Sequence, residues 1–92
     1  MPAVTVEISR LLADMAHTSR RRQVEAATVA SALDALCAEV PALRVHVFDD
    51  EGSVRQHVNI FVRGEIAKGS GALDIALADG DEVAVMQAVS GG

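Results

Sequence analysis

The chain has 92 residues, a length that suits one domain built around a single modest hydrophobic core. Half of its residues are hydrophobic but only 2% are aromatic, so the core is expected to consist of valine, isoleucine, leucine and alanine. The net charge of -5 and the shortage of rings on which bases could stack exclude the usual make-up of a protein that binds single-stranded nucleic acid.

Cellular location is suggested by what the sequence lacks. The lone Cys37 has no second cysteine with which to form an internal disulfide, and the first residues show neither the basic nor the apolar stretch of a secretion signal. The longest run without a charged side chain, residues 83–92, is far shorter than the ~18 apolar residues that a membrane-spanning helix needs. We therefore expect a cytoplasmic protein with no membrane segment.

The first part of the chain predicts a β-hairpin. Val4, Val6 and Ile8 alternate with polar residues, which indicates a strand at 3–8 with one buried face. The next segment, up to Arg20, has no clean period and is expected to be a connection with room for a turn of helix. Residues 21–26 alternate weakly and are expected to return antiparallel to the first strand.

The middle of the chain predicts a helix over 28–40. Thr28 is a candidate N-cap, and Pro41 disfavours helical geometry at the residue before it. The segment that follows, 43–48, fits either a short strand or an irregular turn of helix, and 49–53 is a polar loop. Five apolar residues recur at the spacing of one helix face: Val29, Leu33, Leu36, Cys37 and Val40.

The second half predicts further strands separated by turns. Alternation indicates strands at 57–63 and 82–88. Between them lie an expected turn at 64–65, a loop at 68–71, an apolar piece at 72–77 that packs on the sheet edge, and a turn at 79–81.

This order of elements predicts an α+β domain of the β-grasp type, in which one main helix packs across a mixed sheet. The first and last strands would be parallel neighbours at the centre of that sheet. The expected division is a β-grasp domain at 1–88 and a flexible Gly-Gly tail at 89–92.

Catalysis by side chains finds little support in the sequence. Cys37 lies on the apolar helix face, where a free cysteine behaves as a small buried hydrophobe. His17, His46 and His57 lack the spacing and the companions of a zinc site, so no metal is expected. The basic run 20–22 is interpreted as a solvated strand edge, with docking of an acidic partner as the less favoured alternative.

The chemistry is expected at the end of the chain, after the last strand. Fully extended, residues 89–92 would reach ~13–14 Å, far enough to probe a partner's channel. Gly91 and Gly92 remove every side chain beside the terminal carboxylate, so a narrow channel could admit it. A free carboxylate is a poor electrophile, and it would need activation by ATP to an acyl-adenylate before a sulfur or amine nucleophile attacks. A partner enzyme would have to supply the nucleotide and the catalytic groups.

Three segments carry a resemblance to a known family: residues 57–65, the turn at 77–83 and the C-terminal Val-Ser-Gly-Gly. With the first strand and the helix after Thr28, the sequence resembles the ubiquitin-like sulfur carriers of the MoaD/ThiS family, the molybdopterin synthase small subunit and the thiamine sulfur carrier. Arg63 stands where that family commonly has asparagine, and Gln87 where a proline usually precedes the tail.

The resemblance implies a carrier that is not itself an enzyme and binds no cofactor of its own. An E1-like adenylating and sulfurtransferase enzyme would use Mg-ATP to activate Gly92, which would then become a thiocarboxylate. Gly91, Ser90 and Val89 would be the tail residues recognised by the partner. A second enzyme, which makes cysteine, molybdopterin, a thiazole or a sulfur-containing secondary metabolite, would accept the sulfur.

Strand alternation also suggests a docking surface. Phe61 and Met86 are expected on the sheet face opposite the helix, where an aromatic side chain and a methionine would suit contact with a partner. The alternative is that the connection after the first strand folds over them.

Two other functions remain open at this point. The chain could be a ubiquitin-like modifier joined through Gly92 to lysines of other proteins. It could also be a β-grasp interaction module, such as a regulatory subunit, that uses no terminal chemistry.

Overall fold

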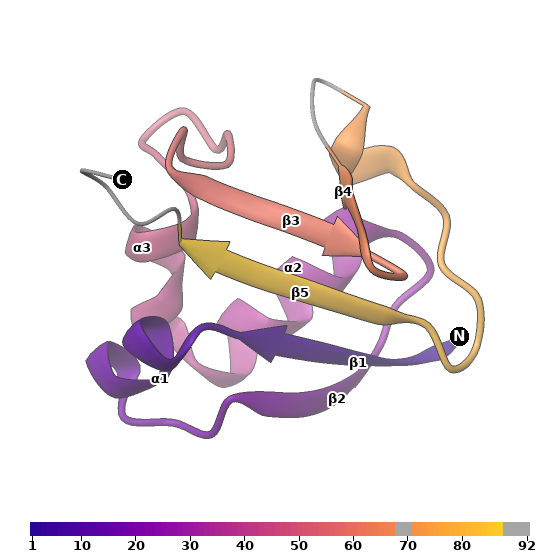
Figure 1. Cartoon of the computed structure of the whole chain (residues 1–92), viewed down its shortest axis with the longest axis horizontal. Helices are drawn as coiled ribbons and strands as arrows, with labels where there is room; N and C mark the ends of the chain where they lie inside the picture. The colour runs from indigo at the N-terminus through magenta and orange to yellow at the C-terminus, as the bar shows by residue number, and fades with distance from the viewer. Residues whose placement is uncertain (68–70, 88–92) are drawn as a thin grey trace.

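The computed structural model describes residues 1–67 and 71–87, and in this part of the chain five strands form one mixed sheet (Figure 1). The order across the sheet is β2-β1-β5-β3-β4. β1 and β5 are parallel, whereas the other neighbouring strands are antiparallel. The first and last strands therefore lie side by side at the centre, as predicted, and the fold is a β-grasp. The strands are β1 Ala3–Ile8, β2 Arg21–Glu25, β3 Val58–Val62, β4 Glu65–Ala67 and β5 Glu82–Gln87.

One helix, α2 (Val29–Glu39), lies across a single face of the sheet, behind the strands in Figure 1. Its start is capped as expected: the Ser31 N–H donates to the Thr28 hydroxyl at 3.2 Å, and the Thr28 N–H donates to the Ser31 hydroxyl at 3.0 Å. Pro41 follows the C-cap Val40 and begins a separate 3-10 turn, η1 (Pro41–Leu43). The predicted helix is confirmed at both ends.

The connection after β1 forms a full short helix, α1 (Arg10–Ala16), where the sequence predicted no more than a turn. Ser9 is its N-cap and accepts a hydrogen bond from the Leu12 N–H at 3.2 Å. His17 closes it in the left-handed conformation, with φ of 55°. Only Leu12 and Ala13 are buried, so the apolar pattern is too brief to show a helical period.

Residues 43–47 are helical and only Phe48 is extended, so the strand alternative for this segment is wrong. They run from the end of η1 into α3 (Arg44–Val47), and Phe48 is its C-cap. The apolar piece at 72–77 contains the 3-10 turn η2 (Ala72–Asp74). The Leu77 N–H donates to the Ala27 carbonyl at 2.8 Å, so this piece is tied to the chain just before α2.

The turn expected at 64–65 begins one residue earlier. Arg63 and Gly64 have φ of 52° and 84°, and Glu65 already starts β4. A two-residue turn with both φ positive matches the right-handed twist of two antiparallel strands. β4 consequently pairs with β3, and Ile66 lies directly opposite Phe61.

The core lies between the sheet and α2. Cys37 is part of it, as predicted, and is 2% exposed. Each large apolar side chain that is fully buried contributes about 1.5–3 kcal/mol relative to an exposed one. From the sheet, the core takes Val4, Val6, Ile8, Val24, Val58, Ile60, Val62, Val83 and Val85, and from α2 it takes Val29, Ala32, Leu33, Leu36 and Cys37.

No helix among the described residues is long and apolar enough to cross a membrane.

Candidate functional site

The face of the sheet opposite α2 carries a cluster of apolar side chains, which we call the open-face patch: Phe61, Ile66, Ala84 and Met86. Phe61 is paired with Ala84 of β5 and with Ile66 of β4. Met86 pairs with Asn59, so it is a diagonal neighbour of Phe61 on the same face. Phe61, Ala84 and Met86 are half-buried, and Ile66 is 47% exposed.

A shallow hollow of about 350 Å³ lies on this face. Its described lining comes from β1, β3, β5 and the turn at Gly64, and α1 contributes none of it. The segment after β1 therefore does not cover Phe61 and Met86, contrary to the alternative considered from the sequence. Ile66 was missed there because residues 64–65 predicted a turn with no strand after it. The lining residues are Glu7, Phe61, Gly64, Glu82, Val83, Ala84 and Met86.

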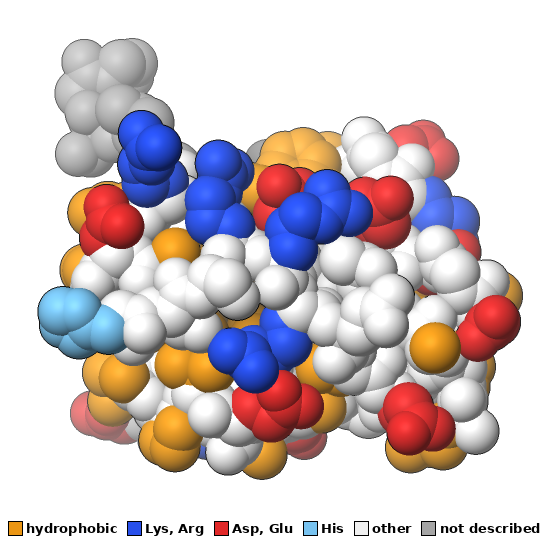
Figure 2. All heavy atoms as spheres, turned by 90° about the horizontal axis from the view of Figure 1, so that it is seen from below, with side chains coloured by type: hydrophobic (Ala, Val, Ile, Leu, Met, Phe, Trp, Pro, Cys, Tyr) orange, Lys and Arg blue, Asp and Glu red, His pale blue; other side chains and the backbone are white. Residues whose placement is uncertain are grey.

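Charged side chains surround the hollow in pairs of opposite sign. Glu7 is 3.9 Å from Arg20, and Glu82 is 3.7 Å from Arg21, counted between nitrogen and carboxylate oxygen. Figure 2 shows basic side chains in blue and acidic side chains in red mixed along the upper border of the molecule. Exposed ion pairs of this kind contribute little to stability, so their charged side chains can form ion pairs with another protein at little cost.

The basic run 20–22 is engaged within the chain. Besides the two pairs above, Arg22 contacts Glu39 at 2.8 Å and donates to the Thr18 hydroxyl at 2.8 Å. Within β2, Arg21 and Arg22 point to opposite sides of the sheet, because side chains alternate along a strand. This arrangement favours the interpretation of a solvated strand edge over a concentrated basic patch.

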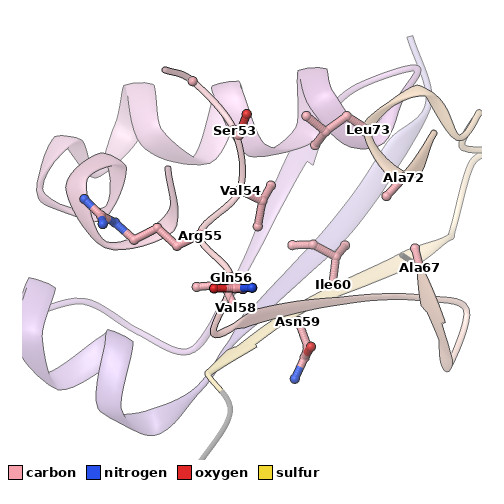
Figure 3. Close-up of a pocket in the computed structure, with 11 residues that line it drawn as sticks. Ser53, Val54, Arg55, Gln56, Val58, Asn59, Ile60, Ala67, Ala72 and Leu73 are labelled. Carbon is pink, nitrogen blue, oxygen red and sulfur yellow. The ribbon is translucent and has the colours of Figure 1, made fainter. Parts of the chain in front are cut away.

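A second hollow, of about 520 Å³, lies between the start of β3, the loop before it and η2. In Figure 3, Val54, Ile60 and Leu73 approach it from these three segments, while Asn59 points to the other side of β3. Its described lining holds no Asp, Glu, His or Cys. The one charged residue in this described lining, Arg55, donates from Nε to the Val45 carbonyl at 2.8 Å. The described lining therefore mixes apolar side chains with neutral polar ones and this arginine.

The side chains that could suggest catalysis or metal binding stand apart from one another. Cys37 is buried in α2, and desolvation raises the pKa of its thiol above the ordinary value. His17 follows α1, His46 lies within α3 and His57 precedes β3. Within residues 1–67 and 71–87, no three His, Cys, Asp or Glu side chains are grouped so that they could hold a metal ion.

The tail residues proposed from the sequence, Val89, Ser90, Gly91 and Gly92, lie outside the described residues, as does the boundary at 88. The last described residue of β5, Gln87, pairs with Val58 at the start of β3. Met86 of the open-face patch directly precedes it. The patch thus extends to within two residues of the segment 88–92.

Comparison with known proteins identifies related chains over nearly the whole length. The model of the ThiS family matches residues 9–92. The chain is 43% identical over 88 residues to small archaeal modifier protein 1 of Haloferax volcanii, covering 90% of this chain and 97% of the relative. It is 34% identical over 93 aligned positions to the sulfur carrier protein CysO of Mycobacterium tuberculosis, covering 97% of this chain and 98% of the relative.

Solved structures of such proteins have the same fold. The crystal structure of the Haloferax volcanii protein superposes with a TM-score of 0.85 at 40% identity, covering 98% of this chain and 99% of the other. CysO in the Amycolatopsis orientalis BexX/CysO complex superposes with a TM-score of 0.84 at 26% identity, covering 97% and 99%. These relatives are small proteins named as a modifier or as a sulfur carrier, and one of the solved structures is a complex with a second protein.

Proposed function

We propose that this chain, which belongs to the ThiS family, is a sulfur carrier. A partner enzyme activates its C-terminal Gly92 and loads it with sulfur. The observation that carries the proposal is the family match, which runs through to residue 92 and so includes both terminal glycines. The similarity to CysO, a protein named as a sulfur carrier, supports the same function.

The chemistry needs little from the carrier beyond its terminal carboxylate. A carboxylate oxygen of Gly92 attacks the α-phosphate of Mg-ATP on an E1-like enzyme, and pyrophosphate leaves. A sulfide ion then attacks the acyl carbon, so that a C–S bond forms as the C–O bond to AMP breaks, and loss of the S–H proton leaves a thiocarboxylate. The absence of side chains at Gly91 and Gly92 lets that carbon be approached closely.

In this proposal the open-face patch is the surface that holds the activating enzyme. Half-buried apolar side chains beside charged ones resemble the apolar centre and polar rim of a protein interface. Because Met86 lies next to the end of β5, a partner bound there is near the segment that follows. Val89 and Ser90 complete the recognised segment ahead of the glycines. A solved complex of a relative with a second protein supports docking of a protein partner.

Conjugation to other proteins is the second candidate function. It is favoured by the 43% identity to a protein named as a modifier, a higher identity than that to CysO. A modifier would use the same adenylate, but a lysine amine would displace AMP and form an isopeptide bond. The two functions differ in the nucleophile that follows activation.

The deciding experiment is the intact mass of the full chain after incubation with an E1-like enzyme from the same organism, Mg-ATP and a sulfur source. A sulfur carrier gains the mass of one sulfur atom minus one oxygen atom. The matched control lacks Gly92 and should show no gain.

Two outcomes would contradict the sulfur carrier. Stable higher-mass conjugates to lysines of other proteins, without any thiocarboxylate, would favour the modifier. No change in mass with any activating enzyme, together with normal function of the chain lacking Gly91 and Gly92, would favour an interaction module.

A further inference from the structure

The outer edge of β2 has hydrogen-bonding groups that no other strand in the described part of the chain takes. The Ile8 N–H donates to the Arg20 carbonyl and the Ala26 N–H donates to the Pro2 carbonyl, which fixes which residues face β1. By the alternation of an antiparallel ladder, the backbone groups of Arg21, Gln23 and Glu25 point away from the sheet. Within the described residues, the only bond to these groups is from the Ser19 hydroxyl to the Arg21 carbonyl.

This edge is also open to solvent. Arg21, Gln23 and Glu25 are all exposed. Figure 2 views the molecule from the β2 edge of the sheet, and atoms drawn white, which are backbone or other side chains, form a band across the middle. A row of unpaired N–H and C=O groups is a template for pairing with another strand. The opposite edge of the sheet offers a shorter row of backbone groups for pairing, because β4 has only three residues.

The sequence of β2, Arg-Arg-Gln-Val-Glu, is complementary to itself when reversed. If two copies pair antiparallel with Gln23 opposite Gln23 of the second copy, each Arg21 lies opposite a Glu25. Arg21 and Glu25 are on the same side of the strand as Glu7, which pairs with Arg21. Their side chains would therefore meet on one face, and directly opposite charges stabilise a strand pair.

We infer that the β2 edge is a self-association surface at which two copies of this chain pair antiparallel about Gln23. The pair joins two five-stranded sheets into one and gives each outward backbone group of Arg21, Gln23 and Glu25 a partner. The existing Arg21 to Glu82 contact does not oppose it, since that pair is 3.7 Å apart and more than half exposed at both ends.

The geometry of such a pair leaves the open-face patch free. A twofold axis through Gln23 runs perpendicular to the joined sheet, so both α2 helices lie on one side and both patches on the other. A partner that itself has two docking surfaces could then engage two carriers at once, with the gain in avidity that linkage provides. The area buried by one five-residue strand pair is small, so we expect weak association, with a Kd of about 10 µM to 1 mM.

The test is sedimentation velocity of the full chain across roughly that range of concentration. The wild type should shift from monomer to dimer. Arg21→Glu places two Glu–Glu contacts in each dimer, and Glu25→Arg places two Arg–Arg contacts. Each should raise the dimer Kd about tenfold. The double variant, which exchanges the two charges, should restore association toward the wild-type value.

Matched controls separate this pairing from a general effect of charge. Arg10→Glu makes the same change in net charge as Arg21→Glu at an exposed residue of α1, and it should leave the Kd unchanged. Gln23→Pro removes an outward N–H where the β1–β2 ladder needs none, so it should keep the fold and abolish the dimer. The charge exchange tests the same pairing even if the proline variant does not fold.

Three results would each overturn the inference. The first is a wild type that stays monomeric over the whole range. The second is a dimer that the single charge reversals do not weaken. The third is a double variant that associates no better than the single ones.

Discussion

Cys37 is the only cysteine of the chain, and its surroundings suppress the reactivity of its thiol. Its thiol is buried in the core, and desolvation is the main reason that its pKa is raised. Arg44 acts in the opposite direction, but its guanidinium is also 3.6 Å from Asp34, whose charge raises the pKa again. Since the thiolate is the reactive form, Cys37 is inert in the folded chain.

The raised pKa of Cys37 predicts a dependence of stability on pH. Below the ordinary thiol pKa, about 8.5, both folded and unfolded chains keep the proton. Above it the unfolded chain loses the proton while the folded chain retains it, so the free energy of unfolding should fall as pH rises from about 8.5 toward the folded-state pKa. Urea unfolding at several pH values measures this fall.

Cys37→Ala is the matched control for that prediction. It should cost about 1 kcal/mol at pH 7, because it leaves a small void in the core, and it should remove the thiol's part of the fall above pH 8.5. A slope identical in the two proteins would contradict the assignment. In the wild type, alkylation at pH 8 should be slow until the chain is unfolded.

Among the elements, the turn between β3 and β4 requires an unusual backbone conformation at two successive residues. Arg63 and Gly64 both have positive φ, a region that residues with a Cβ rarely adopt. Asparagine tolerates this conformation better than arginine does, which accounts physically for its frequency at this position in the family that the sequence resembles. Arg63 instead pairs with Asp81, which also accepts a hydrogen bond from the Ala78 N–H at 2.8 Å.

Gly64→Ala is predicted to destabilise the chain by about 1 kcal/mol, because alanine is strained at a φ of 84°. Gly71→Ala is the matched control. A Cβ meets no atom within 4 Å at either position, but Gly71 has an ordinary φ of -85°. Urea unfolding of both variants should show a loss for Gly64→Ala only. An equal loss in both would mean that the backbone conformation of the turn is not the cause.

Apart from β2, which buries only Val24, the strands and the helix that the sequence predicted have an apolar pattern that repeats along the element. β1, β3 and β5 each place two or three alternate side chains in the core, and α2 buries five along one stripe. α1 buries only Leu12 and Ala13 and is held by Ser9 and His17 at its ends. β4 has three residues and exists because the turn before it aligns them with β3. Such elements depend on caps and on pairing with distant residues, and these interactions produce no repeating apolar pattern in the sequence.

At the scale of the whole molecule, the open-face patch results from the topology. The central position of β1 and β5 brings the first and last strands side by side, and β3 adds Phe61 beside β5. Alternation along each strand was sufficient to predict that Phe61 and Met86 share a face. Ile66 could not be predicted, because its place depends on the pairing of β4. The role of this face and of the tail stays a prediction.

If the open-face patch binds the activating enzyme, truncating it should weaken activation without unfolding the domain. Phe61→Ala and Ile66→Ala should each raise the carrier concentration that gives half-maximal adenylation about tenfold, since apolar side chains at the centre of an interface carry much of its affinity. The maximal rate should change less, because Gly92 is untouched. The measurement is pyrophosphate release by the E1-like enzyme at increasing carrier concentration.

Val45→Ala is the matched control for these variants. Val45 is 65% exposed on α3, outside the sheet, so its truncation removes exposed apolar surface of similar kind away from the patch. Thermal unfolding should confirm that all three variants are folded at the assay temperature. Equal effects of Val45→Ala and Phe61→Ala would mean that the enzyme does not single out this face. A loss confined to Phe61→Ala and Ile66→Ala would assign docking to the open-face patch.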